Sequence, residues 1–168
     1  MKVKIIQTMN KRKSMDTTQD PYILKVGNSK AALCRRCHAT YQNKRWYISK
    51  ELYDKKAALK STRIVLCPAC RKIKDNFPGG IVKLKGDFLQ EHETEIMNLI
   101  RNEEIRSMGF NPLERIIEIL HTREGIEVKT TNEKLAQKIT RRLERAYQGK
   151  AEYKWSNGTK LLRAEWIR

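Results

Sequence analysis

The sequence predicts an α+β protein in which a four-cysteine zinc module, of the treble-clef or zinc-ribbon kind, precedes a layer of helices on a mixed sheet. Three observations support this: two Cys-x-x-Cys pairs, helical apolar periodicity after residue 88, and a hairpin signal near residue 157. The expected parts are a flexible basic N-terminal extension over 1–30, a zinc-binding module over 31–78 and an α+β domain over 79–168 that ends in a hairpin.

The four thiolates expected to hold one structural zinc ion belong to Cys34, Cys37, Cys67 and Cys70. Zinc favours a closed tetrahedron of sulfur ligands in structural sites, and each Cys-x-x-Cys turn, or knuckle, bends two thiolates around one ion. Such a site has no open position for water or substrate, so we expect no enzyme. Iron is the competing metal. A thiol redox protein is the remote alternative, and it would need exposed cysteines of low pKa.

The neighbours of the four cysteines leave room for secondary structure around the ion. The 29 residues between Cys37 and Cys67 are enough for a hairpin or a short helix, and a helix is expected from Arg71 onward, as in a treble clef. His38 adjoins the first knuckle but is surplus to a four-thiolate site, so we interpret it as an exposed loop residue.

The first elements after the second knuckle are a strand over 81–85 and a helix over 88–107 that Gly109 ends. A second helix is expected next, because Asn111 suits an N-cap and Pro112 suits the first helical position. The apolar face of this second helix would contain Leu113, Ile116, Ile117 and Leu120.

The following segment alternates Ile126, Val128 and Thr130, which predicts a strand. Asn132 is then the expected N-cap of a third helix, which Gly149 ends. The side chains expected to face inward are Leu135, Ala136, Ile139, Leu143, Ala146 and Tyr147.

The C-terminal hairpin is predicted from Asn157-Gly158, because Asn and Gly tolerate the positive φ values of a type I′ turn. A two-residue loop at this position would set the register of both strands. The expected opposite pairs are Tyr153 with Leu162, Ala151 with Ala164, and Glu152 with Arg163.

Charge predicts a polyanionic partner. Lys and Arg outnumber Asp and Glu by 36 to 19, for a net charge of +17, and residues 34–80 alone carry +9 from 12 basic and 3 acidic residues. Nucleic acid is the leading partner class. The sequence contains no run of eighteen apolar residues, the length that a membrane-spanning helix needs, and the apolar stretch near the N-terminus is too short for a signal peptide. We therefore expect a cytoplasmic protein with no membrane partner.

The residues expected to contact RNA lie in the zinc module, where basic side chains interleave with aromatic ones. They are Arg35, Arg36, Lys44, Arg45, Trp46, Arg71 and Lys72. For Trp46, a place in a small core around the zinc is an equal alternative. A second basic stripe is diluted by acidic neighbours and is expected to be solvated, with contact to RNA or to a protein partner as the alternatives. It contains Lys134, Lys138, Arg141, Arg142 and Arg145.

The segment from Cys34 to Trp46 resembles a knuckle followed by a tryptophan in the NMD-three family, zinc-containing adaptors of the large ribosomal subunit. The second knuckle, Cys67-Pro68-Ala69-Cys70, and the later Gly79-Gly80 with its strand resemble the same family, and the likeness extends over 31–168. The resemblance implies association with the ribosome or ribosomal RNA in a compact partial relative. We do not expect this protein to act in nuclear export, as eukaryotic members of the family do.

The leading hypothesis is therefore a non-enzymatic RNA-binding protein that acts in ribosome assembly or translation. A DNA-binding transcriptional regulator is the alternative within the binding class, but it would need a recognition helix and usually a dimer surface, and neither is evident. The sequence indicates no oligomeric state.

Overall fold

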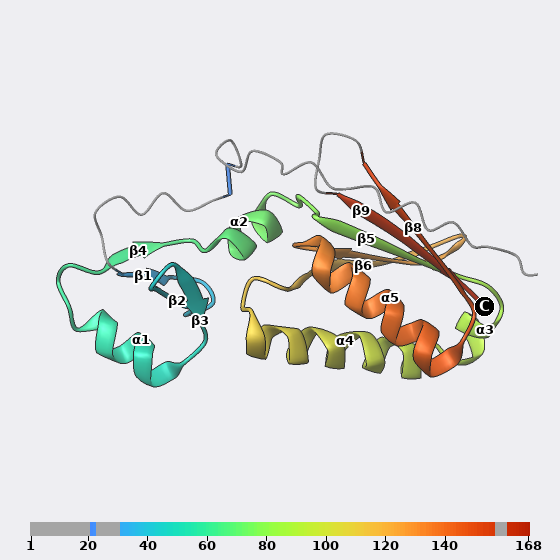
Figure 1. Cartoon of the computed structure of the whole chain (residues 1–168), viewed down its shortest axis with the longest axis horizontal. Coiled ribbons are helices and arrows are strands. Elements are labelled where there is room, and N and C mark those ends of the chain that lie inside the picture. The colour runs from blue at the N-terminus through green and yellow to red at the C-terminus, as the bar shows by residue number, and fades with distance from the viewer. Residues whose placement is uncertain (1–20, 23–30, 157–160) are drawn as a thin grey trace, which may run out of the picture.

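The computed structural model describes residues 21–22, 31–156 and 161–168, which form two mixed sheets with helices packed beside them (Figure 1). This confirms the predicted α+β class, with the four cysteines near the N-terminal part of the chain. The expected flexible extension lies, except for Pro21 and Tyr22, outside the described residues.

The first sheet has the strand order β3-β2-β1-β4 and surrounds the cysteines. Strands β1 and β4 are parallel, whereas β2 is antiparallel to both β1 and β3. The elements of this part are β1 (Ala31–Cys34), β2 (Thr40–Gln42), β3 (Arg45–Tyr47), α1 (Lys50–Ala57), β4 (Arg63–Val65) and α2 (Pro68–Lys74).

The 29 residues between the knuckles thus hold both a hairpin and a helix. Asn43 and Lys44 join β2 to β3 with φ values of 50° and 62°, the consecutive positive angles of a type I′ turn. Ser49 caps α1, because its hydroxyl accepts from the Leu52 N–H at 3.2 Å. The helix expected from Arg71 starts earlier, at Pro68, so the second knuckle forms its first turn.

The second sheet has the order β6-β7-β5-β9-β8, and only β5 and β9 run parallel among its described pairs. Its helices α4 and α5 lie on one face (Figure 1). The elements are β5 (Gly80–Lys85), α3 (Phe88–Glu91), α4 (Glu93–Phe110), β6 (Ile116–Thr122), β7 (Gly125–Thr130), α5 (Glu133–Tyr147), β8 (Lys150–Trp155) and β9 (Leu162–Ile167).

The larger core lies between this sheet and its helices. Alternate side chains of β5, β7 and β9 point toward α4 and α5, and a fully buried tryptophan, Trp166, anchors the last strand. The core side chains without exposed surface are Val82, Leu84, Ile96, Ile100, Val128, Leu135, Ala136, Ile139, Leu143, Leu162 and Trp166.

The predicted helix after Asn111 is wrong, because this segment is strand β6. Asn111 caps only a turn, its Oδ1 accepting from the Leu113 N–H at 3.1 Å. Ile116 pairs with Thr130 and Ile119 with Val128, and the register shifts between Ile116 and Glu118. This bulge breaks the strict alternation of the strand, so the apolar residues fall at a spacing that imitates a helix.

The helix before Asn111 also differs from the prediction, whereas the helix after Asn132 agrees with it. The helix expected over 88–107 is interrupted at His92 and continues to Phe110, so Gly109 lies in its last turn and does not follow it. Helix α5 begins after Asn132, whose Oδ1 accepts from the Leu135 N–H at 3.0 Å, as predicted. Its inward residues are also confirmed, except that Ala146 is exposed.

The C-terminal hairpin exists, but its predicted register is wrong by two residues. Ala151 lies opposite Trp166, and Glu152 lies opposite Glu165 rather than Arg163. The predicted turn at Asn157-Gly158 lies outside the described residues, and in the described part next to it the Ser156 N–H donates to the Leu161 carbonyl. A shift of two keeps every side chain on its predicted face.

The register is fixed at the other end of the hairpin by Trp166. Its ring is fully buried, and its Nε1 donates to the Gln148 carbonyl at 2.7 Å. Gln148 and Gly149 follow α5 with positive φ values, and the chain turns here into β8 at the edge of the sheet. The buried ring and its hydrogen bond therefore set the pairing that the turn sequence alone did not indicate.

Candidate metal centre

The four predicted zinc ligands come together at one point of the first sheet. One Sγ atom from each of Cys34, Cys37, Cys67 and Cys70 lies within 4.8 Å of all the others, and the Cys37 and Cys67 sulfurs are 3.6 Å apart. A tetrahedron with metal–sulfur bonds of about 2.3 Å has sulfur–sulfur edges of about 3.8 Å. The cluster therefore suits one metal ion, and its all-sulfur donor set suits zinc.

The local backbone explains how the two knuckles meet. Cys34 ends β1, and its parallel pairing with Val65 brings the end of β4 next to the first knuckle. The Arg35 N–H donates to the Val65 carbonyl at 2.9 Å, and the Cys34 N–H donates to Ala39 at 2.8 Å to close the knuckle. Since the second knuckle opens α2 directly after β4, sheet pairing places all four sulfurs together.

Three N–H donors point at the sulfurs. The Cys67 N–H lies 3.3 Å from the Cys34 Sγ, and the Cys70 N–H lies 3.4 Å from the Cys67 Sγ. The third donor comes from the segment directly before β6, where the Arg115 Nη1 donates to the Cys70 Sγ at 3.8 Å. Donors of this kind stabilise thiolates over thiols.

The thiols differ in how readily they ionise. Hydrogen bonding from Cys37 and Cys67 lowers the pKa of Cys34, while the hydrogen bond with Cys34 raises the pKa of Cys67. Burial, and then the charge of Cys37, raises the pKa of Cys70 to about 12. Four thiolates so close together need a cation to offset their charge, so metal binding would release protons from the site.

A small apolar core surrounds the cysteines. Cys34, Cys67 and Cys70 have no exposed surface, and Trp46 packs against them with 8% of its surface exposed. The Trp46 and Tyr41 rings lie 5.3 Å apart. This burial favours the core alternative for Trp46 over a role in base stacking.

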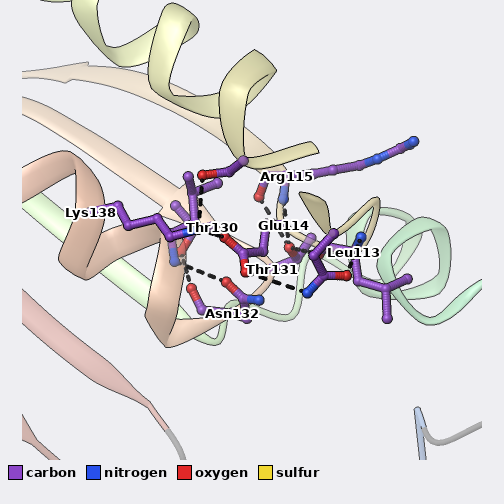
Figure 2. Close-up of polar contacts among 10 residues, drawn as sticks. Leu113, Glu114, Arg115, Thr130, Thr131, Asn132 and Lys138 are labelled. Atoms are coloured by element: carbon purple, nitrogen blue, oxygen red, sulfur yellow. Dashed lines mark hydrogen bonds and ion pairs between the residues drawn. The ribbon is translucent and has the colours of Figure 1, made fainter. Parts of the chain in front are cut away.

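A polar junction connects this module to the larger sheet (Figure 2). Thr131 is its centre: its hydroxyl accepts from the Arg115 N–H at 2.9 Å and donates to the Leu113 carbonyl at 2.6 Å. The Thr131 carbonyl accepts from the Lys72 Nζ at 3.1 Å. Lys72, expected to contact phosphate, therefore has its ammonium at this junction.

Beside Thr131 lies an ion pair whose carboxylate is buried and whose ammonium side chain is partly exposed (Figure 2). Glu114 is 4% exposed, and its Oε2 accepts from the Lys138 Nζ at 2.7 Å. Lys138 also donates to the Ser107 hydroxyl at 3.2 Å, so its ammonium links α5 to α4 and to the junction. Lys138 thus does not belong with the exposed cations of the predicted stripe, which are Lys134, Arg141, Arg142 and Arg145.

The other predicted RNA-contact residues lie on the surface of the module. Arg35, Arg36, Lys44 and Arg45 are exposed, and Arg71 is half-buried. Arg35 and Arg71 line the same open groove, of about 720 Å³, whereas the other three do not border it. His38 is exposed, with its ring 5.0 Å from that of Tyr53.

Sequence reasoning missed Arg115, Glu114 and Thr131. No spacing rule marks Arg115, which follows Cys70 by 45 residues and reaches it only through the tertiary fold. Thr131 precedes a recognised helix cap, but nothing in the sequence indicates that it is 2% exposed and bonded on both sides.

Comparison with known proteins adds no family assignment. No protein-family model matches the chain, and a search of curated proteins finds no match. The resemblance to the NMD-three family therefore stays a prediction. Within the part of the chain that the structure describes, no helix is long and apolar enough to cross a bilayer.

Proposed function

We propose that this protein is a non-enzymatic, zinc-containing RNA-binding protein that associates with the ribosome or ribosomal RNA. The observation that carries the proposal is the position of exposed arginines inside a metal knuckle: Arg35 and Arg36 lie between the clustered ligands Cys34 and Cys37. A metal held there would fix the backbone of both arginines, so less conformational entropy would be lost when they meet phosphates.

The metal in this proposal is one structural zinc. Four sulfur ligands close the coordination shell, and three of the four cysteines are fully buried, so the ion would organise the fold without meeting substrate. A redox role would instead need thiols that are both accessible and low in pKa. The pKa values of Cys67 and Cys70 are raised, and Cys34, whose pKa is lowered, has no exposed surface.

Charge supports RNA as the partner class. Residues 34–80 carry a net charge of +9, whereas residues 81–168 carry +3 from 17 basic and 14 acidic residues. In and next to the larger sheet, acidic side chains form local ion pairs with basic ones, such as those of Lys85 with Glu124 and Glu165, so that charges of opposite sign offset each other there. The positive field is therefore concentrated around the metal module. Ribosomal RNA, rather than another RNA, is suggested by the resemblance of both knuckles to the NMD-three family.

Binding of ribosomal subunits tests the proposal. Tagged protein should co-sediment with the large subunit on gradients at low and moderate salt, and binding should weaken with salt because phosphate neutralisation releases counterions. Replacing Arg35 and Arg36 by Ala should flatten the salt slope by roughly 1.4 to 1.8 and leave metal content unchanged. The matched control is Arg142→Ala with Arg145→Ala, which removes the same charge from α5 and should have the smaller effect.

Three outcomes would contradict parts of this proposal. Equal losses from both double variants would move the RNA surface to the helical layer. Preference for duplex DNA over RNA would favour the regulator alternative. Metal-free protein with thiols that titrate rapidly would favour redox chemistry.

A further inference from the structure

The groove beside the metal site is lined by two elements of the module. Strand β4 and the turn after it contribute Ile64, Val65 and Leu66, and α2 contributes Arg71, Lys74 and Asp75. Arg35, from the first knuckle, completes the lining. The groove is open and has a volume of about 720 Å³, within the roughly 300–1,000 Å³ of ordinary ligand sites.

The groove carries a positive net charge, and its cations form no ion pairs with the described residues. Over the described ranges, 21–22, 31–156 and 161–168, none of Arg35, Arg71 and Lys74 forms an ion pair within 4.0 Å. The one carboxylate in the groove, Asp75, accepts a hydrogen bond from the Tyr22 hydroxyl at 3.1 Å. The groove therefore holds three cations and one carboxylate, and this excess of positive charge suits an anionic ligand with more than one charge.

The backbone at two of these cations, Arg35 and Arg71, is held by hydrogen bonds. The Arg35 N–H is bonded to the Val65 carbonyl at 2.9 Å, and the Arg71 N–H is bonded to the Cys67 carbonyl at 3.0 Å in the first turn of α2. The Arg71 guanidinium also lies 5.5 Å from the centre of the Tyr22 ring. The backbone at both arginines is thus already ordered, so their binding to an anion would cost side-chain entropy but little backbone entropy.

The groove also has an apolar wall. Ile64 is 70% exposed, lies in the middle of edge strand β4 and lines the same groove as the cations of the first knuckle and of α2. An exposed isoleucine among phosphate-binding side chains suits a ligand that alternates charge with apolar surface. RNA does this when its bases are unpaired, because duplex RNA keeps its bases stacked inside and presents phosphate and sugar.

We propose that the groove formed by Arg35, Ile64, Arg71 and Lys74 binds a single-stranded segment of RNA, with phosphates on the three cations and a base or ribose on Ile64. This inference rests on the proposed RNA-binding function and narrows it to one site and one RNA conformation. An extended acidic peptide is the competing occupant, because it would also place carboxylates on the cations.

Fluorescence anisotropy with labelled oligouridine tests the charge of the groove in the full-length, metal-loaded protein. Arg35→Ala, Arg71→Ala and Lys74→Ala together should weaken binding at least about tenfold and flatten the salt slope by about two units. The control replaces Lys50, Lys55 and Lys60 by Ala, three exposed cations on and after α1 outside the groove lining. Equal losses from both triple variants would overturn the proposal, since net charge alone would then explain binding.

Two further comparisons test the apolar wall and the unpaired bases. Ile64→Ala should weaken oligouridine binding about fivefold without changing the salt slope, whereas Ile48→Ala, at an isoleucine that is 52% exposed outside the groove, should have no effect. Oligouridine should also bind more tightly than the duplex that it forms with oligoadenosine. Equal binding of the duplex, or tighter binding of polyglutamate than of oligouridine, would overturn the single-strand assignment.

Different experimental results would contradict this inference and the proposed function. If the wild-type protein binds ribosomal RNA but the groove variants bind equally well, only the groove assignment is wrong. If the wild-type protein binds neither ribosomal RNA nor oligouridine, RNA binding itself is wrong. Metal content of each variant shows that a loss of binding does not come from a disrupted metal site.

Discussion

The guanidinium of Arg115 donates to the Sγ of Cys70 across 3.8 Å, although Cys70 lies in helix α2 and Arg115 lies directly before strand β6 of the larger sheet. A zinc ion with four thiolates carries a net charge of minus two, which a neighbouring guanidinium would partly offset. The Arg115 Nε is itself held by the Pro112 carbonyl at 3.0 Å. The segment that leads into β6 of the larger sheet thus supplies a positive charge to the metal site beside the smaller sheet.

Arg115→Ala is expected to lower zinc affinity by about tenfold, because hydrogen-bond donors next to metal ligands typically contribute 10–100-fold. Competition with a chromophoric chelator measures the change. Arg123→Ala is the matched control, since Arg123 is exposed and lies in the turn between β6 and β7. Unchanged affinity in the Arg115 variant would show that the guanidinium has no effect on the metal.

Removal of the metal should unfold the small module first. Purified protein is expected to contain one zinc per chain, and chelation or Cys67→Ser should expose residues 31–78 to protease before the larger sheet is cut. Zinc binding in small fingers contributes roughly 10–16 kcal/mol, which is comparable to or above the roughly 5–15 kcal/mol stability of a whole domain. Native protection of the module in the Cys67 variant would contradict a structural role for the ion.

The ion pair of Glu114 and Lys138 should respond asymmetrically to substitution. Lys138→Met leaves a carboxylate that is 5% exposed without its cation and should cost about 3 kcal/mol. Glu114→Gln should cost less, about 1–2 kcal/mol, because the amide can still accept from Lys138, whose side chain is 41% exposed.

Urea denaturation measures both changes in the free energy of unfolding. Lys134→Met serves as the control, since Lys134 is an exposed lysine on the same helix. If Lys138→Met were no more destabilising than Lys134→Met, the pair would contribute nothing to stability.

Two glycine substitutions are expected to have opposite effects. A Cβ on Gly80 would lie 2.5 Å from the Cβ of Ala136 and 2.7 Å from the Oγ1 of Thr130, so Gly80→Ala should force β5 and α5 apart and cost about 1–3 kcal/mol. A Cβ on Gly109 would meet no atom within 4 Å, and Gly109→Ala should stabilise α4 by about 0.4–1 kcal/mol. Thermal melting of both variants checks the two signs, and equal shifts would contradict the close approach at Gly80.

The sequence predicted those features that depend on local spacing. The two Cys-x-x-Cys pairs were sufficient to identify the metal cluster, and the cap at Asn132 with its helical periodicity located α5. The strand β6 was missed because its bulge between Ile116 and Glu118 shifts the apolar residues out of alternation. A local rule that assumes a regular strand cannot detect such an insertion.

Features set by tertiary contacts were not predictable in this way. The register of β8 and β9 depends on the burial of Trp166 and its hydrogen bond to Gln148, which outweigh the turn preference of Asn157 and Gly158. Likewise, the groove next to the metal needs the parallel pairing of β1 with β4, which brings Arg35 close to α2. Neither arrangement follows from residues near one another in the chain.

The position of β9 has a consequence for the order in which the two sheets can form. It pairs with β5 in parallel, Gly80 facing Leu162 across 82 positions of sequence, and it separates β5 from β8. Loop closure over that distance is entropically more costly and slower than closure over the 30 and 33 positions that separate Cys37 and Cys34 from Cys67. The metal module can therefore assemble early, while β5 keeps an open edge, prone to pairing with other strands, until residues 162–167 arrive.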